Sequence, residues 1–210
     1  MIELYLMRHA ESENNAVPEK DRKIGGRASA VPLTRLGVGQ AWAAGEELAR
    51  AKIRFDGIFC SAAVRARQTL ENALARAPAL RDAPVVFSGQ IEEREQGAWA
   101  GLRVADVYTR ETVADICAAQ LDHKPEGGES FREAGARMMA FVCGRILLRH
   151  RRGVFLLLGH GLATRCFLHA CFNFPPQLVS AIPFGNACFS KLVFEDGAWR
   201  MKYWNQRWLL

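Results

Sequence analysis

Two histidines, His9 and His160, follow short apolar runs and are the residues best suited to chemistry. His9 stands directly after Arg8, at the end of the run 1–7, and His160 follows the run 154–158 between two glycines. A neutral imidazole is a nucleophile, and a guanidinium group binds anionic oxygens through paired hydrogen bonds. These residues therefore predict attack by an imidazole on an anionic centre that arginine holds.

Two further residues with chemical potential follow other apolar runs. Arg65 lies in the first turns of a predicted helix after residues 55–60, and Glu93 lies in a polar loop after residues 84–87. Phosphoryl transfer needs a nucleophile, positive charge over the phosphoryl oxygens and an acid for the leaving group. Two arginines, two histidines and one glutamate supply these functions.

The elements that position these residues are buried strands alternating with helices. Apolar runs of about four to eight residues, closed by a polar residue or glycine, are typical of strands in a parallel sheet. We expect such strands at 2–7, 55–60, 84–87 and 154–158. Ligands bind outside the carboxyl ends of strands in such sheets, so all the candidate residues are expected at one rim.

The remaining pattern predicts the helices and a terminal hairpin. Thr34 is expected to cap one helix and Ser61 the next, over 62–77. We expect one or two weak helices in 103–126, the longest helix at 130–150, another at 162–172, and a hairpin of 187–194 with 199–204.

This order predicts an α/β fold, a three-layer α/β/α sandwich with a mostly parallel sheet and an antiparallel edge strand. Its 210 residues suit a single domain, 1–210, with a short cap at about 103–128.

Composition narrows the partners. The net charge of +6 favours an anionic partner. The basic residues 149–152 end a predicted helix and lack interleaved aromatic residues, so a small phosphorylated ligand fits better than nucleic acid. No apolar stretch of about 18 residues predicts a membrane span, and the first residues do not resemble a signal peptide.

The six cysteines lack CxxC or zinc-type spacing, which favours free thiols in a cytoplasmic protein. We expect no metal, because the rim is basic rather than rich in carboxylates, and no cofactor.

Several short blocks resemble a known family. Arg8-His9-Ala10-Glu11-Ser12 is similar to the Arg-His-Gly-Glu-Ser signature of the histidine phosphatase superfamily, which includes the cofactor-dependent phosphoglycerate mutases. Other blocks match in the same order, and the likeness covers about residues 2–195. These blocks are Pro32-Leu33-Thr34, Cys60-Ser61 with Arg65, Glu93 with Gly97, Gly127-Gly128-Glu129-Ser130 and Gly159-His160-Gly161.

The resemblance implies residue roles. His9 would be the nucleophile that becomes phosphorylated, and Glu93 the proton donor to the leaving oxygen, with Glu92 as its competitor. Contacts to the phosphoryl group or the substrate would come from Arg8, Arg65, His160, Asn15, Gly161 and Leu162.

Departures from the family pattern favour hydrolysis over phosphoglycerate mutation. The segment 101–127 is short and lacks a paired-arginine block, and Leu162-Ala163 stand where mutases usually carry Asn-Ser. We therefore expect a metal-independent phosphomonoester hydrolase that acts through a phosphohistidine on a small phosphorylated metabolite. A cofactor-dependent phosphoglycerate mutase and a non-enzymatic scaffold that binds phosphorylated ligands remain the alternatives.

For the remaining polar and apolar residues, we expect structural or surface roles rather than catalytic ones. We expect His123, His150 and His169 to have no part in catalysis, with a substrate contact by His123 from the cap left open. Lys20, Arg22, Lys23 and Arg27 are expected to be solvated in a surface loop, and a place for this loop at the border of the pocket is the alternative. The apolar tail 204–210 is expected to pack on its own domain rather than on a partner, with a homodimer left open.

Overall fold

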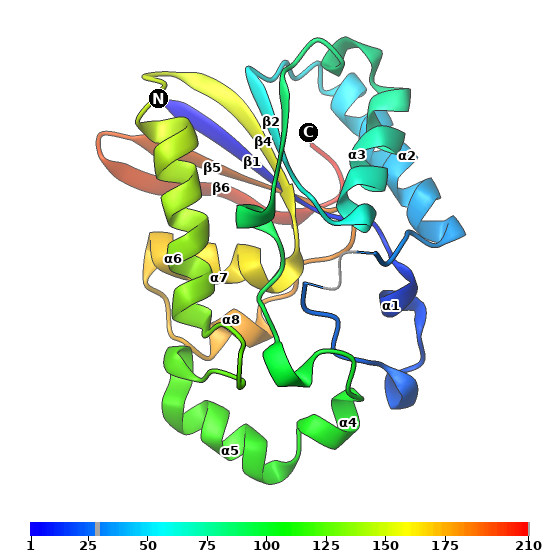
Figure 1. The fold of residues 1–210 in the computed structure, drawn as a ribbon. Coiled ribbons are helices and arrows are strands. Elements are labelled where there is room, and N and C mark those ends of the chain that lie inside the picture. Colours follow the sequence, from blue (N-terminus) through cyan, green and yellow to red (C-terminus); the bar gives the residue numbers. More distant parts are fainter. Residues whose placement is uncertain (28–29, 210) are drawn as a thin grey trace.

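The computed structural model describes residues 1–27 and 30–209, and its described strands form one sheet in the order β3-β2-β4-β1-β5-β6 (Figure 1). The strands are β1 (Ile2–Arg8), β2 (Gly57–Ser61), β3 (Val85–Ser88), β4 (Gly153–Gly159), β5 (Phe189–Glu195) and β6 (Ala198–Gln206). β1 to β4 are parallel, β5 is antiparallel to β1, and β6 is antiparallel to β5. The predicted fold class is confirmed, with β5 one place inside the edge because its hairpin partner β6 takes the edge.

Helices cover both faces of this sheet, with α2 and α3 on one side and α6 and α7 on the other (Figure 1). The α-helices are α1 (Glu13–Ala16), α2 (Arg35–Arg50), α3 (Val64–Arg76), α4 (Val104–Val107), α5 (Arg110–Ala119), α6 (Phe131–Val142), α7 (Gly161–Phe172) and α8 (Leu178–Ala181). Shorter helical turns are η1 (Glu19–Asp21), η2 (Pro78–Leu80), η3 (Gly89–Ile91), η4 (Gly97–Trp99), η5 (Gln120–Asp122) and the π-helical η6 (Cys143–Leu147).

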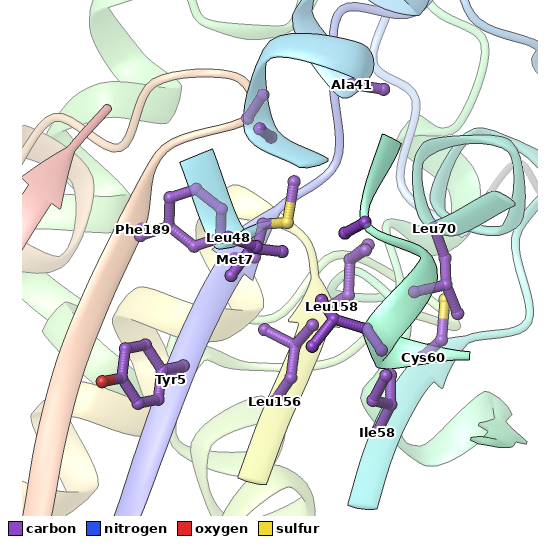
Figure 2. Packing of buried hydrophobic residues seen from close by; sticks show 14 of the residues in the cluster. Tyr5, Met7, Ala41, Leu48, Ile58, Cys60, Leu70, Leu156, Leu158 and Phe189 are labelled. Carbon is purple, nitrogen blue, oxygen red and sulfur yellow. The ribbon is translucent and has the colours of Figure 1, made fainter. Parts of the chain in front are cut away.

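The core has two halves because successive strand residues point to opposite faces of the sheet. In β1, Tyr5 and Met7 join the cluster beneath α2 and α3, whereas Leu4 and Leu6 join the cluster beneath α6 and α7. Figure 2 shows the first cluster, in which Met7 lies between strand and helix side chains. Both faces of β1 are therefore buried over Leu4 to Met7, which explains the apolar sequence of that part of the strand.

The predicted cap of the second helix is wrong. Ser61 is the last residue of β2, because it still pairs with Ser88 of β3, and α3 begins at Val64 after Ala63. The Ser61 hydroxyl accepts a 3.3 Å hydrogen bond from the Ala63 amide but also lies 2.8 Å from His160 Nε2. Ser61 thus belongs to the rim of the sheet.

The predicted helix over 130–150 is also shorter than expected. Ser130 does cap it, through a capping box with Glu133, but the regular α-helix ends at Val142 and one π-helical turn follows. That turn carries Ile146, which is fully buried. The longest α-helix among the described residues is consequently α2, with 16 residues.

Part of the tail packs on its own domain, as predicted, whereas Trp208 is 64% exposed and residue 210 lies outside the described residues. Trp204 stacks on Phe184 with ring centroids 4.4 Å apart, and Leu209 packs against the core cluster beneath α2 and α3. None of the described helices is both long enough and apolar enough to cross a bilayer.

Candidate active site

The candidate residues meet at the carboxyl ends of the parallel strands, around a pocket of about 660 Å³. The predicted residues come from several different strand ends, loops and helix starts, so the parallel topology gathers them. The predicted residues that line the pocket are Arg8, His9, Asn15, Arg65, Glu93 and Leu162.

His9 presents one defined ring nitrogen for chemistry. Its Nδ1 lies 2.7 Å from the carbonyl oxygen of Ala10, which can only accept, so Nδ1 carries the proton and Nε2 carries the lone pair. Burial, together with the positive charges of Arg65 and Arg8, holds the pKa of His9 well below its ordinary value. The imidazole is therefore neutral and suited to nucleophilic attack through Nε2.

His160 lies beside His9, with ring centroids 5.1 Å apart, but its nitrogens have other partners. Arg65 Nη2 lies 3.0 Å from Nδ1 and can only donate, so Nε2 carries the proton and donates to Ser61 Oγ. The ring is fully buried, and burial with the charge of Arg65 holds its pKa well below the ordinary value. His160 thus orients Arg65, and its predicted contact with the phosphoryl group stays a prediction.

The guanidinium group of Arg8 lies at the start of α7, where Gly161 has no side chain to exclude it. A Cβ on Gly161 would lie 3.3 Å from Arg8 Nε, so a glycine allows the guanidinium to approach the helix terminus. Arg8 Nη1 donates to the Phe184 carbonyl at 2.6 Å, while its Nε is buried without a hydrogen-bond partner among the described residues. A buried donor without an acceptor is costly, and an anion in the pocket would relieve that cost.

Glu93 reaches the same helix terminus from the loop after β3. Its carboxylate accepts hydrogen bonds from the backbone amides of Leu162 at 3.1 Å and Ala163 at 2.7 Å. These are amides of the first turn of α7, where the helix dipole favours negative charge. Glu93 lines the pocket and Glu92 does not, which supports the choice of Glu93 over its neighbour.

Asn15 has a fixed orientation at the other wall. Its Oδ1 accepts hydrogen bonds from Ser12 Oγ at 3.1 Å and from Asn186 Nδ2 at 3.2 Å. These contacts identify which side-chain atom of Asn15 is the oxygen, so the other atom is the amide nitrogen that can donate. Asn186 also donates to the carbonyl of His9 at 3.0 Å. Asn15 lines the pocket, and its predicted contact with the phosphate or substrate stays a prediction.

The sequence as a whole also matches a known protein family. The family model described as the histidine phosphatase superfamily (branch 1) matches residues 4–207. The chain belongs to the histidine phosphatase superfamily.

Relatives within the superfamily carry both mutase and phosphatase names. A 2,3-bisphosphoglycerate-dependent phosphoglycerate mutase of Methylobacterium sp. (strain 4-46) is 33% identical over 168 residues, or 79% of this chain and 78% of that protein. A mycobacterial glucosyl-3-phosphoglycerate phosphatase, solved with VO3, has a TM-score of 0.81 at 23% identity over 98% of this chain and 100% of its own. The alpha-ribazole phosphatase of Shigella flexneri has a TM-score of 0.80 at 21% identity over 99% and 98%. The two solved structures establish a shared fold.

This superfamily member also has site residues that sequence reasoning missed. Arg165 lines the pocket, and its Nη1 donates to the carbonyl of Ile182 at 2.8 Å. The signal for Arg165 was its spacing, since it lies four residues after Gly161 and hence on the same face of α7. The signal for Asn186 was weaker. Asn186 shortly precedes β5, and because β5 is antiparallel to β1, it begins at the rim where the parallel strands end.

A partly buried ion pair holds the loop that carries Glu93. Arg137 Nε lies 2.7 Å from Glu129 Oε1, and the same guanidinium donates to the carbonyls of Gln90 at 2.7 Å and Glu92 at 3.2 Å. Glu129 in turn accepts from the backbone amide of Glu95 at 3.0 Å. Its pKa is lowered by hydrogen bonds from Arg137 and Glu95, which outweigh burial. Glu129 and Arg137 therefore fix the path of the Glu93 loop.

Two expectations about neighbouring basic residues and histidines can now be compared with the structure. Arg22 and Lys23 line the pocket, so for these two residues the loop borders the pocket, the alternative that was left open beside solvation at the surface. His123 does not line it, and instead lies 5.2 Å from the ring of Trp99. Among the described residues, no group of three or more His, Cys, Asp and Glu side chains is arranged to hold a metal.

Proposed function

We propose that this protein is a metal-independent phosphomonoester hydrolase that acts through a phosphohistidine at His9. The observation that carries the proposal is the His9 tautomer, with its Nε2 lone pair in a pocket lined by Arg8 and Arg65. Nε2 attacks phosphorus as the bond to the ester oxygen breaks, and the two guanidinium groups stabilise the phosphoryl oxygens.

Glu93 completes the cycle as acid and then as base. In its protonated form it gives its proton to the leaving ester oxygen, which departs as the alcohol. Its carboxylate then takes a proton from water as the water oxygen attacks phosphorus and the bond to Nε2 breaks. Inorganic phosphate leaves, and His9 returns to the neutral form.

Hydrolysis is favoured over mutation by the cap. The residues of 103–128 that line the pocket are apolar or uncharged, among them Val104, Val113 and Ile116. A mutase must hold a second anionic group of its substrate. Arg22 and Lys23, which line the pocket beside the start of the cap, keep a phosphoglycerate mutase as the second candidate, in line with the names of relatives about 33% identical.

The test is phosphate release in excess EDTA from a panel of phosphomonoesters, run with wild type and His9→Ala. We expect wild type to release phosphate and the variant to lose more than ~1000-fold in kcat with an unchanged Tm, because the nucleophile is gone. The panel includes 3-phosphoglycerate with and without 2,3-bisphosphoglycerate. Isomer without phosphate release would establish the mutase instead.

Other outcomes distinguish the remaining readings. A variant that keeps its activity would contradict the phosphohistidine. Stabilisation by phosphate or vanadate without turnover of any ester would favour the scaffold. We further propose a reducing, cytoplasmic location, which the free state of all six cysteines supports.

A further inference from the structure

Helix α5 carries an apolar stripe that no part of the described chain buries. None of its residues is buried, and Val113 is 42% exposed. Val113, Ile116 and Cys117 lie three and four residues apart, hence on one face of the helix, and all three line the active-site pocket. An amphipathic helix normally turns such a face to a hydrophobic core, whereas here the face turns to the substrate pocket.

Aromatic residues extend this stripe into a wall. Tyr108 lines the pocket and is 40% exposed, and Trp99 supports it edge-on with ring centroids 5.8 Å apart. His123 lies against the far side of this pair, 5.2 Å from Trp99. The exposed Tyr108 ring is thus held in place by neighbours that do not themselves line the pocket.

The wall is continuous with the phosphate end of the pocket. Phe131 lines it with its ring 4.5 Å from the guanidinium of Arg94, which also lines the pocket and is buried. Leu162 lines it as well, and the backbone amide of Leu162 donates to Glu93. An ester whose phosphate lies at His9 therefore meets an apolar surface as its alcohol portion extends toward the cap.

We propose that this wall binds the alcohol portion of the substrate, and that the substrates are phosphate monoesters of alcohols with a sizeable apolar group. The inference deepens the proposed function and rests on it. Ligand pockets of about 300–1,000 Å³ take molecules of drug size, and this pocket of about 660 Å³ lies in that range. A three-carbon acid such as phosphoglycerate would leave the wall exposed to water.

The experiment measures binding of n-alkylphosphonates, from butyl to octyl, to the wild-type protein by calorimetry. Phosphonates cannot be hydrolysed, so this measurement does not depend on turnover. We expect Kd to fall about three- to fourfold for each added methylene, the value for apolar surface moved out of water. The hydrolysis of the matching n-alkyl phosphates, whose leaving groups have similar basicity, is measured in parallel.

Variants locate the effect on the wall. Val113→Asn and Ile116→Asn alter a helix without buried residues, and we expect each to flatten the dependence of Kd on chain length. Leu148→Asn, at a residue 84% exposed and outside the pocket, is the matched control and should keep the wild-type dependence.

The outcomes separate this inference from the proposed function. A wild-type Kd that does not change with chain length, or a dependence that both α5 variants retain, overturns the inference even where the esters are hydrolysed. Length-dependent binding without phosphate release from any alkyl ester supports the apolar wall and overturns the hydrolase.

Discussion

The residue scale shows two neighbouring histidines of opposite tautomer. Nδ1 of His9 donates a hydrogen bond to the Ala10 carbonyl, whereas a guanidinium nitrogen of Arg65 donates to Nδ1 of His160. These partners fix the tautomer of each ring, and burial with the nearby arginines keeps the pKa of both histidines low, so both rings are neutral. The nucleophile therefore needs no base to deprotonate it in mildly acidic solution.

The lowered pKa of His9 predicts a stability that falls on acidification. Below an ordinary histidine pKa of about 6.5, His9 is protonated in the unfolded chain but stays neutral in the folded protein. The free energy of unfolding therefore decreases as the pH falls from about 6.5 toward the pKa of His9 in the folded protein. For His9 the slope approaches about 1.4 kcal/mol per pH unit. Free energies of unfolding measured with urea between pH 7 and 5 should depend less steeply on pH in His9→Asn than in the wild type, by up to about that amount. An equal dependence on pH in the two proteins would contradict the low pKa of His9.

Glu93 predicts a dependence on the leaving group. Glu93→Gln removes the proton donor, so we expect kcat to fall by about 10²–10⁴ for alkyl phosphates, whose alcohols leave poorly. Nitrophenyl phosphate needs little acid and should lose far less. Glu92→Gln is the matched control, since Glu92 does not line the pocket and should leave both rates unchanged. Equal losses on both substrates would place the acid elsewhere.

At the scale of elements, the Glu93 loop depends on helix α6 for its position. Arg137→Met removes the hydrogen bonds to the carbonyls of Gln90 and Glu92, so the carboxylate loses its fixed place. We expect kcat for alkyl phosphates to fall more than kcat for nitrophenyl phosphate. Arg132 is on the same helix as Arg137, and Arg132→Met, which breaks an exposed ion pair with Asp122 of η5, serves as the control. A parallel loss on both substrates would indicate general disorder of the site.

The elements also show what a single sequence can predict. Apolar runs locate β1 and β4 because both faces of these strands are buried, and the hydroxyl cap at Thr34 locates the start of α2. The strand ends then locate His9, Arg65 and Glu93. Such local signals do not reveal long-range partners.

Residues that act through distant partners could not be found in this way. Glu129 lies in a turn whose sequence does not show that its carboxylate will meet Arg137 and the Glu95 amide. Ser61 was misassigned for the same reason, since its pairing with Ser88 depends on the register between two strands. Register and loop paths are set by packing between segments far apart in the sequence.

At the scale of the whole molecule, the net charge of +6 acts on substrate capture. A positively charged protein attracts a dianionic ester at long range. Salt screens this attraction, and the Debye length is about 10 Å at 0.1 M ionic strength. We expect kcat/KM to fall severalfold between about 20 and 300 mM KCl, while kcat stays nearly constant. Stopped-flow or initial-rate measurements check this, with a neutral viscogen as control for diffusion. A kcat that falls in parallel would point to an effect on the chemical step.

The central place of β1 in the sheet has a consequence for synthesis on the ribosome. Leu4 pairs with Phe155 of β4 and with Leu192 of β5, so β1 has no strand neighbour until β4, at residues 153–159, has been made, and it lacks its second neighbour until β5 follows. The segment that carries His9 is translated early yet waits for nearly all of the strands before its pairing is complete. Its apolar side chains are exposed during that interval, when chaperones bind such segments. The nucleophile is thus among the first residues made and among the last to reach its working position.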